Sequence, residues 1–376
     1  MPDVLVVGGG IGGLAAAVGL ARIGGRVRVL EQATALGGVG AGLSLWPNAL
    51  RALDELGVGD AVRAAGVSAV SRGGLRRPSG RWLRHRHPDD IAVLMVHRAD
   101  LHRTLLDALP AGRVRTDATV TGVQETADGV TVTYRTRDGV RRTEAELVVA
   151  ADGVHSAVRR QLWPGKTTPR FDGRSAWRAV TDGVLDPAEE AITMEREQQF
   201  GLLPLPDGRV YWFLTADAEQ PGVRHDDALA EVRRRVGHWH DPIPRVLAAT
   251  APGAVLHHDI TTLDPLETYV RGRVVLLGDA AHAQSPDLGQ GACQAIEDAV
   301  VLASALAAER DIAAALERYE RERLPRTQAM ALAAQRQAEL SHRHFRAMTT
   351  AACLLPPALW RRQIMRWVDW TPPALR

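Results

Sequence analysis

Three short apolar runs, each followed at once by a glycine-containing turn, are spread over most of this 376-residue chain. The pairs are residues 4–7 with the turn at 8–13, residues 147–151 with Asp152-Gly153, and residues 274–277 with Gly278-Asp279. Continuous apolar runs of this length are typical of strands buried in a parallel sheet. Because parallel strands end at the same edge of a sheet, we expect the three turns to converge on one extended ligand.

The first turn has the sequence Gly-Gly-Gly-Ile-Gly-Gly at residues 8–13, which contains the GxGxxG pattern. A helical segment follows it, and a second predicted strand at residues 27–30 ends at Glu31. Backbone amides in such a strand–turn–helix unit approach a pyrophosphate, and the helix N-terminus adds partial positive charge. An acidic residue at the end of the second strand accepts hydrogen bonds from an adenosine ribose. The unit predicts a dinucleotide site and leaves FAD and NAD open.

The third turn, Gly278-Asp279, leads through Pro286 to a second glycine-rich segment at residues 289–291 that opens a helix. A carboxylate at a strand end suits a sugar-like polyol. A glycine-rich helix N-terminus suits a ring edge that becomes anionic on reduction. A flavin supplies both groups, whereas a nicotinamide dinucleotide supplies neither in this arrangement. The third turn therefore favours FAD.

The order of the predicted elements indicates an α/β protein with a Rossmann-like FAD-binding domain, an inserted β-sheet substrate domain and a C-terminal helical segment. We assign residues 1–70, 96–168 and 271–340 to the discontinuous FAD-binding domain. The lack of a long helical period assigns residues 71–95 to the sheet domain, and strand-like pieces assign residues 169–270 to it, with one clear helix at about 226–238. Residues 341–376 are expected to form C-terminal helices.

The composition excludes several classes of protein. The net charge of +2 is too small to imply a nucleic-acid partner, and no apolar run reaches the roughly 18 residues of a membrane span. Two cysteines form no disulfide framework, and the histidine pairs near 238–240 and 257–259 lack ligand partners at metal-binding spacing. We expect a cytoplasmic protein, monomeric or homodimeric, without a metal site or an integral membrane segment.

Together these motifs resemble the class A flavoprotein monooxygenases of the p-hydroxybenzoate hydroxylase superfamily. They are most similar to its salicylate, 3-hydroxybenzoate and urate hydroxylase-like branch. The resemblance rests on the three turns with Glu31, on Arg98 in an Arg-x-x-Leu helix start, and on the Ser-Leu-Trp-Pro-Asn segment at 44–48. It covers essentially the whole chain and implies the GR2 type of FAD-binding fold.

The resemblance also implies a set of FAD contacts, from the pyrophosphate at the first turn to the isoalloxazine ring at residues 286–292. Asp152 is implied to bridge FAD and NAD(P)H, and Val120 to back the adenine through its main chain. The implied FAD-binding residues are Gly8, Gly10, Gly12, Gly13, Glu31, Gln32, Ser44, Arg98, Val120, Asp152, Asp279, Pro286, Gly289, Gly291 and Ala292.

The activity that the resemblance implies is hydroxylation of a small aromatic or heteroaromatic compound. NAD(P)H reduces FAD, O2 adds to the reduced flavin, and the C4a-hydroperoxyflavin transfers oxygen. The implied catalytic residues are Tyr211 and Pro286. The substrate is expected between the flavin and the inserted sheet, beside Trp177, Arg178, Gln199, Tyr211 and Trp212.

The identity of the substrate stays open at this point. Gln199 stands where urate hydroxylases use an arginine, which argues against urate. The same chemistry also serves an epoxidase or oxygenase acting on a larger polyene or natural product. A non-catalytic flavin-binding redox sensor is the alternative from another class of protein.

Overall fold

A six-stranded sheet brings the three glycine turns together. The computed structural model describes residues 1–37, 41–68, 73–165, 168–183, 190–342 and 344–375. In this sheet β1 pairs in parallel with β12, and β12 pairs in parallel with β19, so that all three strands end at one edge. The predicted convergence of the turns is confirmed. The strand order is β18 (Val270–Arg271), β19 (Val274–Leu276), β12 (Leu147–Ala150), β1 (Asp3–Val7), β2 (Arg26–Leu30) and β8 (Val114–Arg115).

Helices α1 (Ile11–Arg22) and α9 (Gly291–Ala308) pack closely against each other beside this sheet. A Cβ atom at Gly19 of α1 would lie 3.1 Å from the Cβ of Ala303 of α9, so glycine permits the close approach. By length and composition α9 is apolar enough to cross a membrane, but 78% of it is buried inside the protein. Its apolar character is therefore that of a core helix. The other helices of this part are α2 (Pro47–Glu55), α3 (Gly59–Ala64), α4 (Arg98–Asp107), α5 (Ala157–Leu162) and α8 (Asp279–His282).

Two further sheets are formed by segments that lie, in the chain, between strands of the six-stranded sheet. One is a β-meander of the antiparallel strands β9 (Thr119–Glu125), β10 (Val130–Thr136) and β11 (Gly139–Ala145). A second three-stranded sheet consists of β3 (Gly42–Leu45), β7 (Leu94–His97) and β4 (Gly66–Ser68).

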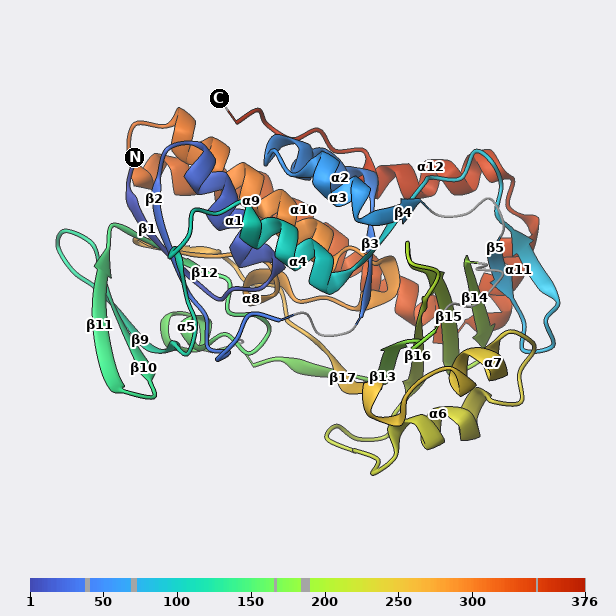
Figure 1. Cartoon of the computed structure of the whole chain (residues 1–376). Coiled ribbons are helices and arrows are strands. Elements are labelled where there is room, and N and C mark those ends of the chain that lie inside the picture. Colours follow the sequence, from blue (N-terminus) through green and yellow to red (C-terminus); the bar gives the residue numbers. More distant parts are fainter. Residues whose placement is uncertain (38–40, 69–72, 166–167, 184–189, 343, 376) are drawn as a thin grey trace.

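The inserted sheet has seven strands and lies at the opposite end of the molecule from β1 and β2 (Figure 1). Its order is β17 (Leu256–Thr262), β13 (Arg170–Val180), β16 (Val210–Asp217), β15 (Gln198–Pro204), β14 (Glu190–Glu195), β5 (Gly73–Arg76) and β6 (Trp82–His85). Strands β5 and β6 join it as expected of residues 71–95, whereas β7 joins the small sheet. Residues 70 and 71, at the expected domain boundary, lie outside the described residues.

One prediction about this sheet is wrong. Besides the expected helix α6 (Ala228–Val236), a second helix, α7 (Ile243–Ala248), covers the same face of the sheet. Six residues are too few for the helical period of apolar residues to stand out in the sequence. The 3-10 turns η1 (Pro252–Ala254) and η2 (Pro286–Leu288) were likewise not predicted.

The C-terminal helices are α10 (Ile312–His342), α11 (Phe345–Leu354) and α12 (Pro357–Val368). Figure 1 shows α10 running beside α9 and the C-terminus returning toward α2. Arg51 of α2 donates hydrogen bonds to the carbonyl oxygens of Val368 and Trp370, at 2.5 and 2.8 Å. The last residues are therefore tied to the first domain.

A fully buried ionic cluster joins α9 to α10. The guanidinium of Arg323 lies 2.5 Å from Glu297 and 2.6 Å from Asp298, and none of the three side chains is exposed. Burial acts to raise the pKa of Asp298, but the charges of His282 and Arg323 outweigh it and lower that pKa to about 2. Asp298 also accepts a hydrogen bond from the backbone amide of Gly278, at 3.0 Å. The cluster thus supports the third glycine turn from beneath.

Replacing Arg323 should destabilise the protein strongly. In Arg323→Met two buried carboxylates lose their shared counter-charge, and we expect a loss of about 3–5 kcal/mol in the free energy of unfolding. Urea denaturation of the FAD-free protein measures it. Arg318→Met, on the same helix, removes the partly exposed ion pair with Glu322 and should cost about 0–1 kcal/mol. Equal losses in the two variants would contradict the assignment.

Candidate functional site

The first glycine turn leaves open space at one glycine and none at two others. A Cβ atom at Gly13 would lie 2.0 Å from the carbonyl oxygen of Gly8, and one at Gly8 would lie 2.4 Å from that of Ala151. Gly8 also has φ +103°, which disfavours any side chain. At Gly10, the residue before α1, no atom lies within 4 Å of the Cβ position. The turn therefore presents its backbone to solvent at Gly10, and Gly12 packs against Leu277.

Glu31 is held beside this turn by two backbone amides. Its carboxylate accepts hydrogen bonds from the amides of Gly9 and Ala33, at 2.6 and 2.8 Å. The next residue, Gln32, is exposed. His102 of α4 lies with Nε2 2.7 Å from the carbonyl oxygen of Gly9 and braces the turn. Sequence reasoning missed His102 because it lies 93 residues further along the chain.

The start of β9 lies beside the end of β2. The amides of Asp117 and Ala118 donate to the carbonyl oxygens of Ala33 and Glu31, each at 2.9 Å. Val120, 8% exposed, follows on β9. The main chain near Val120 and the carboxylate of Glu31 thus belong to one corner, as an adenosine site requires.

The second turn is organised around Asp152. One oxygen of its carboxylate accepts hydrogen bonds from the amides of Ala157 and Val158, at the start of α5, at 2.8 and 3.3 Å. The other oxygen is buried without a hydrogen-bond partner among the described residues. The fully buried Arg159 donates to the carbonyl oxygens of Val154 and Ala280, and so links the second turn to the third. The sequence analysis assigned no role to Arg159.

The third turn exposes a carboxylate without a partner. Gly278 has φ +62°, and Asp279 after it is exposed and makes no ion pair or hydrogen bond through its side chain within the described part of the chain. The carboxylate lies near Gly291, where a Cβ atom would be 3.9 Å from its Oδ1. A polyol that reaches this edge can bond to Asp279 without displacing a protein group.

The N-terminus of α9 lies open next to Asp279. No side chain caps this helix, and its first turn carries no acidic residue, so the amides at Gly291 and Ala292 keep their partial positive charge. Gly289 adopts the left-handed conformation, with φ +61°. A Cβ atom there would be 3.2 Å from Nε1 of Trp46 and 4.0 Å from the Cβ of Ser44, and that Trp46 nitrogen is buried with no hydrogen-bond partner in the part of the chain that the structure describes.

These features fit FAD. Four features lie around the ends of three neighbouring strands. They are the open backbone at Gly10, the carboxylate of Glu31, the carboxylate of Asp279 and the uncapped N-terminus of α9. Buried polar atoms without protein partners occur along the same path: Asp152 Oδ1, Trp46 Nε1 and both amide atoms of Gln284, which precedes Pro286 by two residues. Groups of this kind suit a long polar ligand. Pro286 and Gly289 are exposed beside them.

Two arginines near Tyr211 lack carboxylate partners among the described residues. Arg98 at the start of α4 and Arg178 of β13 make no ion pair among the residues that the structure describes. Burial raises the pKa of Tyr211, although the charges of Arg178 and Arg98 act to lower it. Burial lowers the pKa of His258, and Arg178 reinforces this effect. The two arginines, Tyr211 and His258 therefore share one electrostatic environment.

Trp177 and Trp212 do not belong to this face, which corrects our expectation. Side chains alternate between the two faces of a strand, so Trp212 cannot share a face with its neighbour Tyr211. Trp212 is fully buried in the core under α6 and α7, and its Nε1 donates to Thr250 at 2.9 Å. Trp177 stacks on His257 in the same layer, with 4.3 Å between ring centroids.

The opposite face carries Tyr211, Arg178 and Gln199. Tyr211 packs in a cluster with Ala41, Val93 and Met95, and its ring occupies the space beside Gly42 of β3. Gln199 alternates with Phe200, which lies in the helix-covered core. The expected polar and phenolic residues thus face the small sheet and the FAD-binding part.

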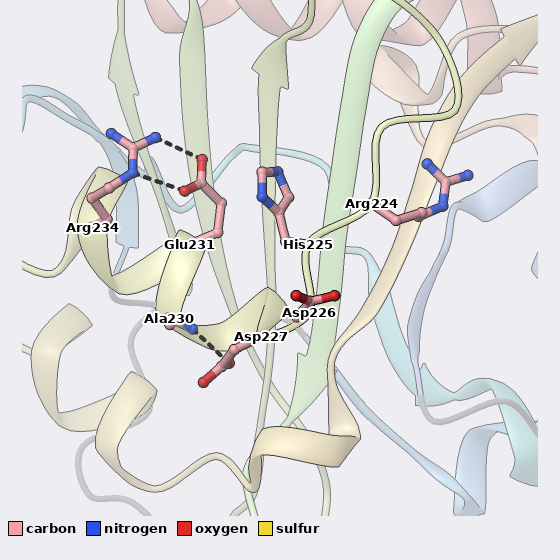
Figure 2. A pocket seen from close by; sticks show the side chains of 7 residues that line it. All are labelled: Arg224, His225, Asp226, Asp227, Ala230, Glu231 and Arg234. Atoms are coloured by element: carbon pink, nitrogen blue, oxygen red, sulfur yellow. Dashed lines mark hydrogen bonds and ion pairs between the residues drawn. The ribbon is translucent and has the colours of Figure 1, made fainter.

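A cavity of about 430 Å³ lies elsewhere, at the start of α6 (Figure 2). Several of its charged groups already have partners: Glu231 lies 2.7 Å from Arg234, and Asp227 accepts a hydrogen bond from the amide of Ala230. The cavity lies on the helix-covered side of the sheet and takes no part in the FAD site.

Neither thiol nor metal chemistry is evident in the described ranges. Burial raises the pKa of the Cys293 thiol to about 12, as expected of a packing residue in α9. No group of three or more His, Cys, Asp or Glu residues is placed to hold a metal among the described residues.

Two glycine variants should separate cofactor binding from folding. Gly10→Ala places its methyl group in open space, so the FAD-free protein should keep its wild-type stability, whereas FAD affinity should fall by about tenfold or more, because a close pyrophosphate contact is blocked. Gly13→Ala collides with Gly8 and should lower both. Thermal unfolding and flavin fluorescence titration measure the two effects. A Gly10→Ala protein that binds FAD as tightly as the wild type would refute the pyrophosphate assignment.

The stacked His257 should make the protein sensitive to acid. Burial, reinforced by Arg224 and His225, lowers its pKa to about 4, so the unfolded chain binds the extra proton first. Stability is present above the unfolded pKa of about 6.5 and is lost as the pH falls toward 4. Allowing for solvent screening, His257→Phe should reduce the difference in unfolding free energy between pH 7 and pH 5 by about 1 kcal/mol. The exposed His155→Phe is the control and should leave that difference unchanged.

Known proteins place the chain in a family. The family described as FAD binding domain matches residues 1–334. The FAD-dependent urate hydroxylase of Klebsiella pneumoniae is 36% identical over 354 residues, 90% of each chain. The aurachin C monooxygenase/isomerase of Stigmatella aurantiaca is 40% identical over 332 residues, 86% of this chain and 85% of that one. Klebsiella pneumoniae HpxO complexed with FAD and uric acid superposes with a TM-score of 0.88 at 30% identity, covering 98% and 97% of the two chains. The chain therefore belongs to the FAD-binding-domain family, as one of its class A flavoprotein monooxygenases.

Proposed function

We propose that this protein is an FAD-dependent monooxygenase that hydroxylates a small aromatic or heteroaromatic compound, with NAD(P)H as reductant and O2 as oxidant. The convergence of an open glycine turn, an unpartnered Asp279 and the uncapped start of α9 carries the proposal. A nicotinamide dinucleotide would not use both the Asp279 carboxylate and the start of α9 in this arrangement. The curated relatives over most of the chain are monooxygenases and hydroxylases, which supports the same class of reaction.

FAD would be held mainly by backbone. Gly10 would receive the pyrophosphate, Glu31 the adenosine ribose and Asp279 the ribityl chain. The amides at the start of α9 would face the ring edge that gains negative charge on reduction. Bound FAD supplies the oxygen-activating and oxygen-transferring chemistry. Arg98, exposed at the start of α4, is placed to meet a phosphate or ribityl oxygen.

The substrate would lie on the face of the seven-stranded sheet that carries Tyr211. The phenol is protonated at neutral pH, and burial raises its pKa further, so its hydroxyl is available as a hydrogen-bond donor. Phe213 offers a second ring two residues along the same strand, and Arg178 and Gln199 offer polar contacts. The apolar cluster of Val93, Met95 and Leu203 excludes water around Tyr211.

The remaining parts of the proposal concern partners. NADH or NADPH would dock transiently, and Asp152 would lie near both this nucleotide and FAD. The protein would act as a monomer or homodimer in the cytoplasm. The low net charge is consistent with the lack of a nucleic-acid partner.

The proposed reaction predicts stimulation of NAD(P)H oxidation by the correct aromatic compound. The holoenzyme is assayed against a panel of phenols, aromatic acids and heteroaromatic compounds, and products are examined by mass spectrometry for one added oxygen atom. Tyr211→Phe should lower kcat/KM by about tenfold, the effect of losing one hydrogen bond in a dry site, with FAD affinity unchanged. Tyr134→Phe, also a buried tyrosine but in β10, is the control and should behave as the wild type.

Other outcomes point to the alternatives. Oxygen insertion into polyene or larger natural-product compounds alone would favour the epoxidase or oxygenase reading. FAD binding and reduction with no oxygen insertion into any compound would favour the redox sensor. A purified protein that takes up no FAD would refute all three.

A further inference from the structure

A buried arginine of the seven-stranded sheet holds the loop that carries Pro286. The guanidinium of Arg174, on β13, donates to both carboxylate oxygens of Asp287, at 3.0 and 2.9 Å, and to Oγ of Ser285 at 2.6 Å. It also pairs with Asp172 at 2.5 Å. The Arg174 and Asp287 side chains are 4% and 2% exposed. A bidentate arginine–carboxylate contact of this kind fixes orientation as well as distance.

The strand is distorted at the point where this contact forms. Phe171 lies opposite Thr261 of β17 and Ser175 lies opposite Asp259, so four steps along β13 match two steps along β17. Gly173 within the bulge has φ +85°, although no atom lies within 4 Å of its Cβ position. The glycine is therefore needed for backbone conformation, not for space. Bulges re-aim side chains, and this one occurs where Arg174 meets the loop.

The same strand carries the candidate substrate contact. Arg174 and Arg178 are four residues apart on β13 and, by alternation, share the face that Tyr211 occupies on β16. The residues that flank this part of the chain are tied to α9 and α2: the amide of Gly278 donates to Asp298 of α9, and Gln290 accepts from Asn48 of α2 at 2.9 Å. The loop is therefore held between the substrate-facing sheet and the FAD-binding part.

We propose that Arg174 is a positioning residue that sets the distance between the Pro286 loop and the substrate-facing side of the seven-stranded sheet. Its catalytic consequence rests on the proposed function; the placement itself is a property of the chain. Productive turnover converts NAD(P)H, H+, O2 and R–H into NAD(P)+, R–OH and water. A misplaced ring leaves NAD(P)H, H+ and O2 to yield NAD(P)+ and H2O2. Because displacement by about 1 Å strongly slows a reaction between two positioned groups, loosening Arg174 diverts turnover to H2O2.

A distance measurement tests the placement without turnover. Spin labels are attached at Val140→Cys in β11 and Val223→Cys near α6, which are 67% and 37% exposed, in a Cys353→Ser background; Cys293 is buried. Arg174→Met should broaden or shift the distance distribution between the labels. Arg170→Met, on the same strand but 60% exposed beside Asp264, should leave it unchanged. An Arg174→Met distribution that matches the wild type would overturn the proposal.

The coupling ratio tests the catalytic consequence. Arg174→Lys keeps the positive charge but cannot make the bidentate contact with the carboxylate, and Asp287→Asn keeps the side-chain shape but loses the negative charge. In both, oxygenated product per NAD(P)H should fall by about fivefold or more, with H2O2 making up the difference and the Kd of FAD changed by less than about threefold. If FAD affinity and thermal stability fall while the remaining holoenzyme stays coupled, Arg174 is merely structural and the proposal fails.

Failure of the proposed function is distinguishable from failure of this inference. A wild-type protein that oxygenates no compound counts against the monooxygenase assignment, and the label distances then decide the role of Arg174 alone. Where Arg174→Met does not fold, the distance measurement is made on Asp287→Asn, in which the same contact is weakened, and an unchanged distribution there overturns the proposal.

Discussion

The parallel pairing of β1 with β12 and of β12 with β19 is the constraint on which the site depends. It brings together three turns, of which the second and third lie about 140 and 270 residues after the first in the chain. It also forces the backbones close together, since the Cβ position of Gly8 lies 2.4 Å from the carbonyl oxygen of Ala151. Glycine at Gly8 is therefore a requirement of the packing between strands before it is a requirement of a ligand. The candidate cofactor site is the exposed edge of that packing.

Buried charge stabilises this edge from two directions. Asp298 and Glu297 with Arg323 lie beneath the third turn, and Arg174 with Asp287 lies between the turn and the inserted sheet. Such groups lose hydration on folding, and only close, multiply bonded geometry offsets that loss. We expect these groups to specify one arrangement of the loop rather than to add net stability. In the proposed function this loop would lie against the flavin ring, where a single arrangement is needed.

The sequence indicates most residues of the candidate cofactor site and few of the residues that support it. Gly13, Glu31 and Asp279 were identified because backbone approach and strand ends impose residue types at fixed local spacing. Arg174 and Asp287 are 113 residues apart, and His102 and Gly9 are 93 apart, so no local pattern reveals either contact. Helix α7 was missed because six residues show no period. Two strands depart from the expected division: β7 lies in the small sheet, and β18 in the six-stranded sheet begins at Val270, the last residue assigned to the sheet domain.

The substrate face illustrates a different limit of sequence reasoning. Trp177 and Trp212 were chosen with Arg178 and Tyr211 by residue type, although alternation allows only one of each neighbouring pair on a given face. Parity alone does not say which face is covered. The amphipathic helix α6 decides it, because Leu229 and Val232 require an apolar partner surface and the tryptophans provide one. In the proposed function the cofactor would be bound mainly by backbone, which leaves a glycine pattern in the sequence, whereas the substrate would be met by side chains whose side of the sheet depends on distant packing.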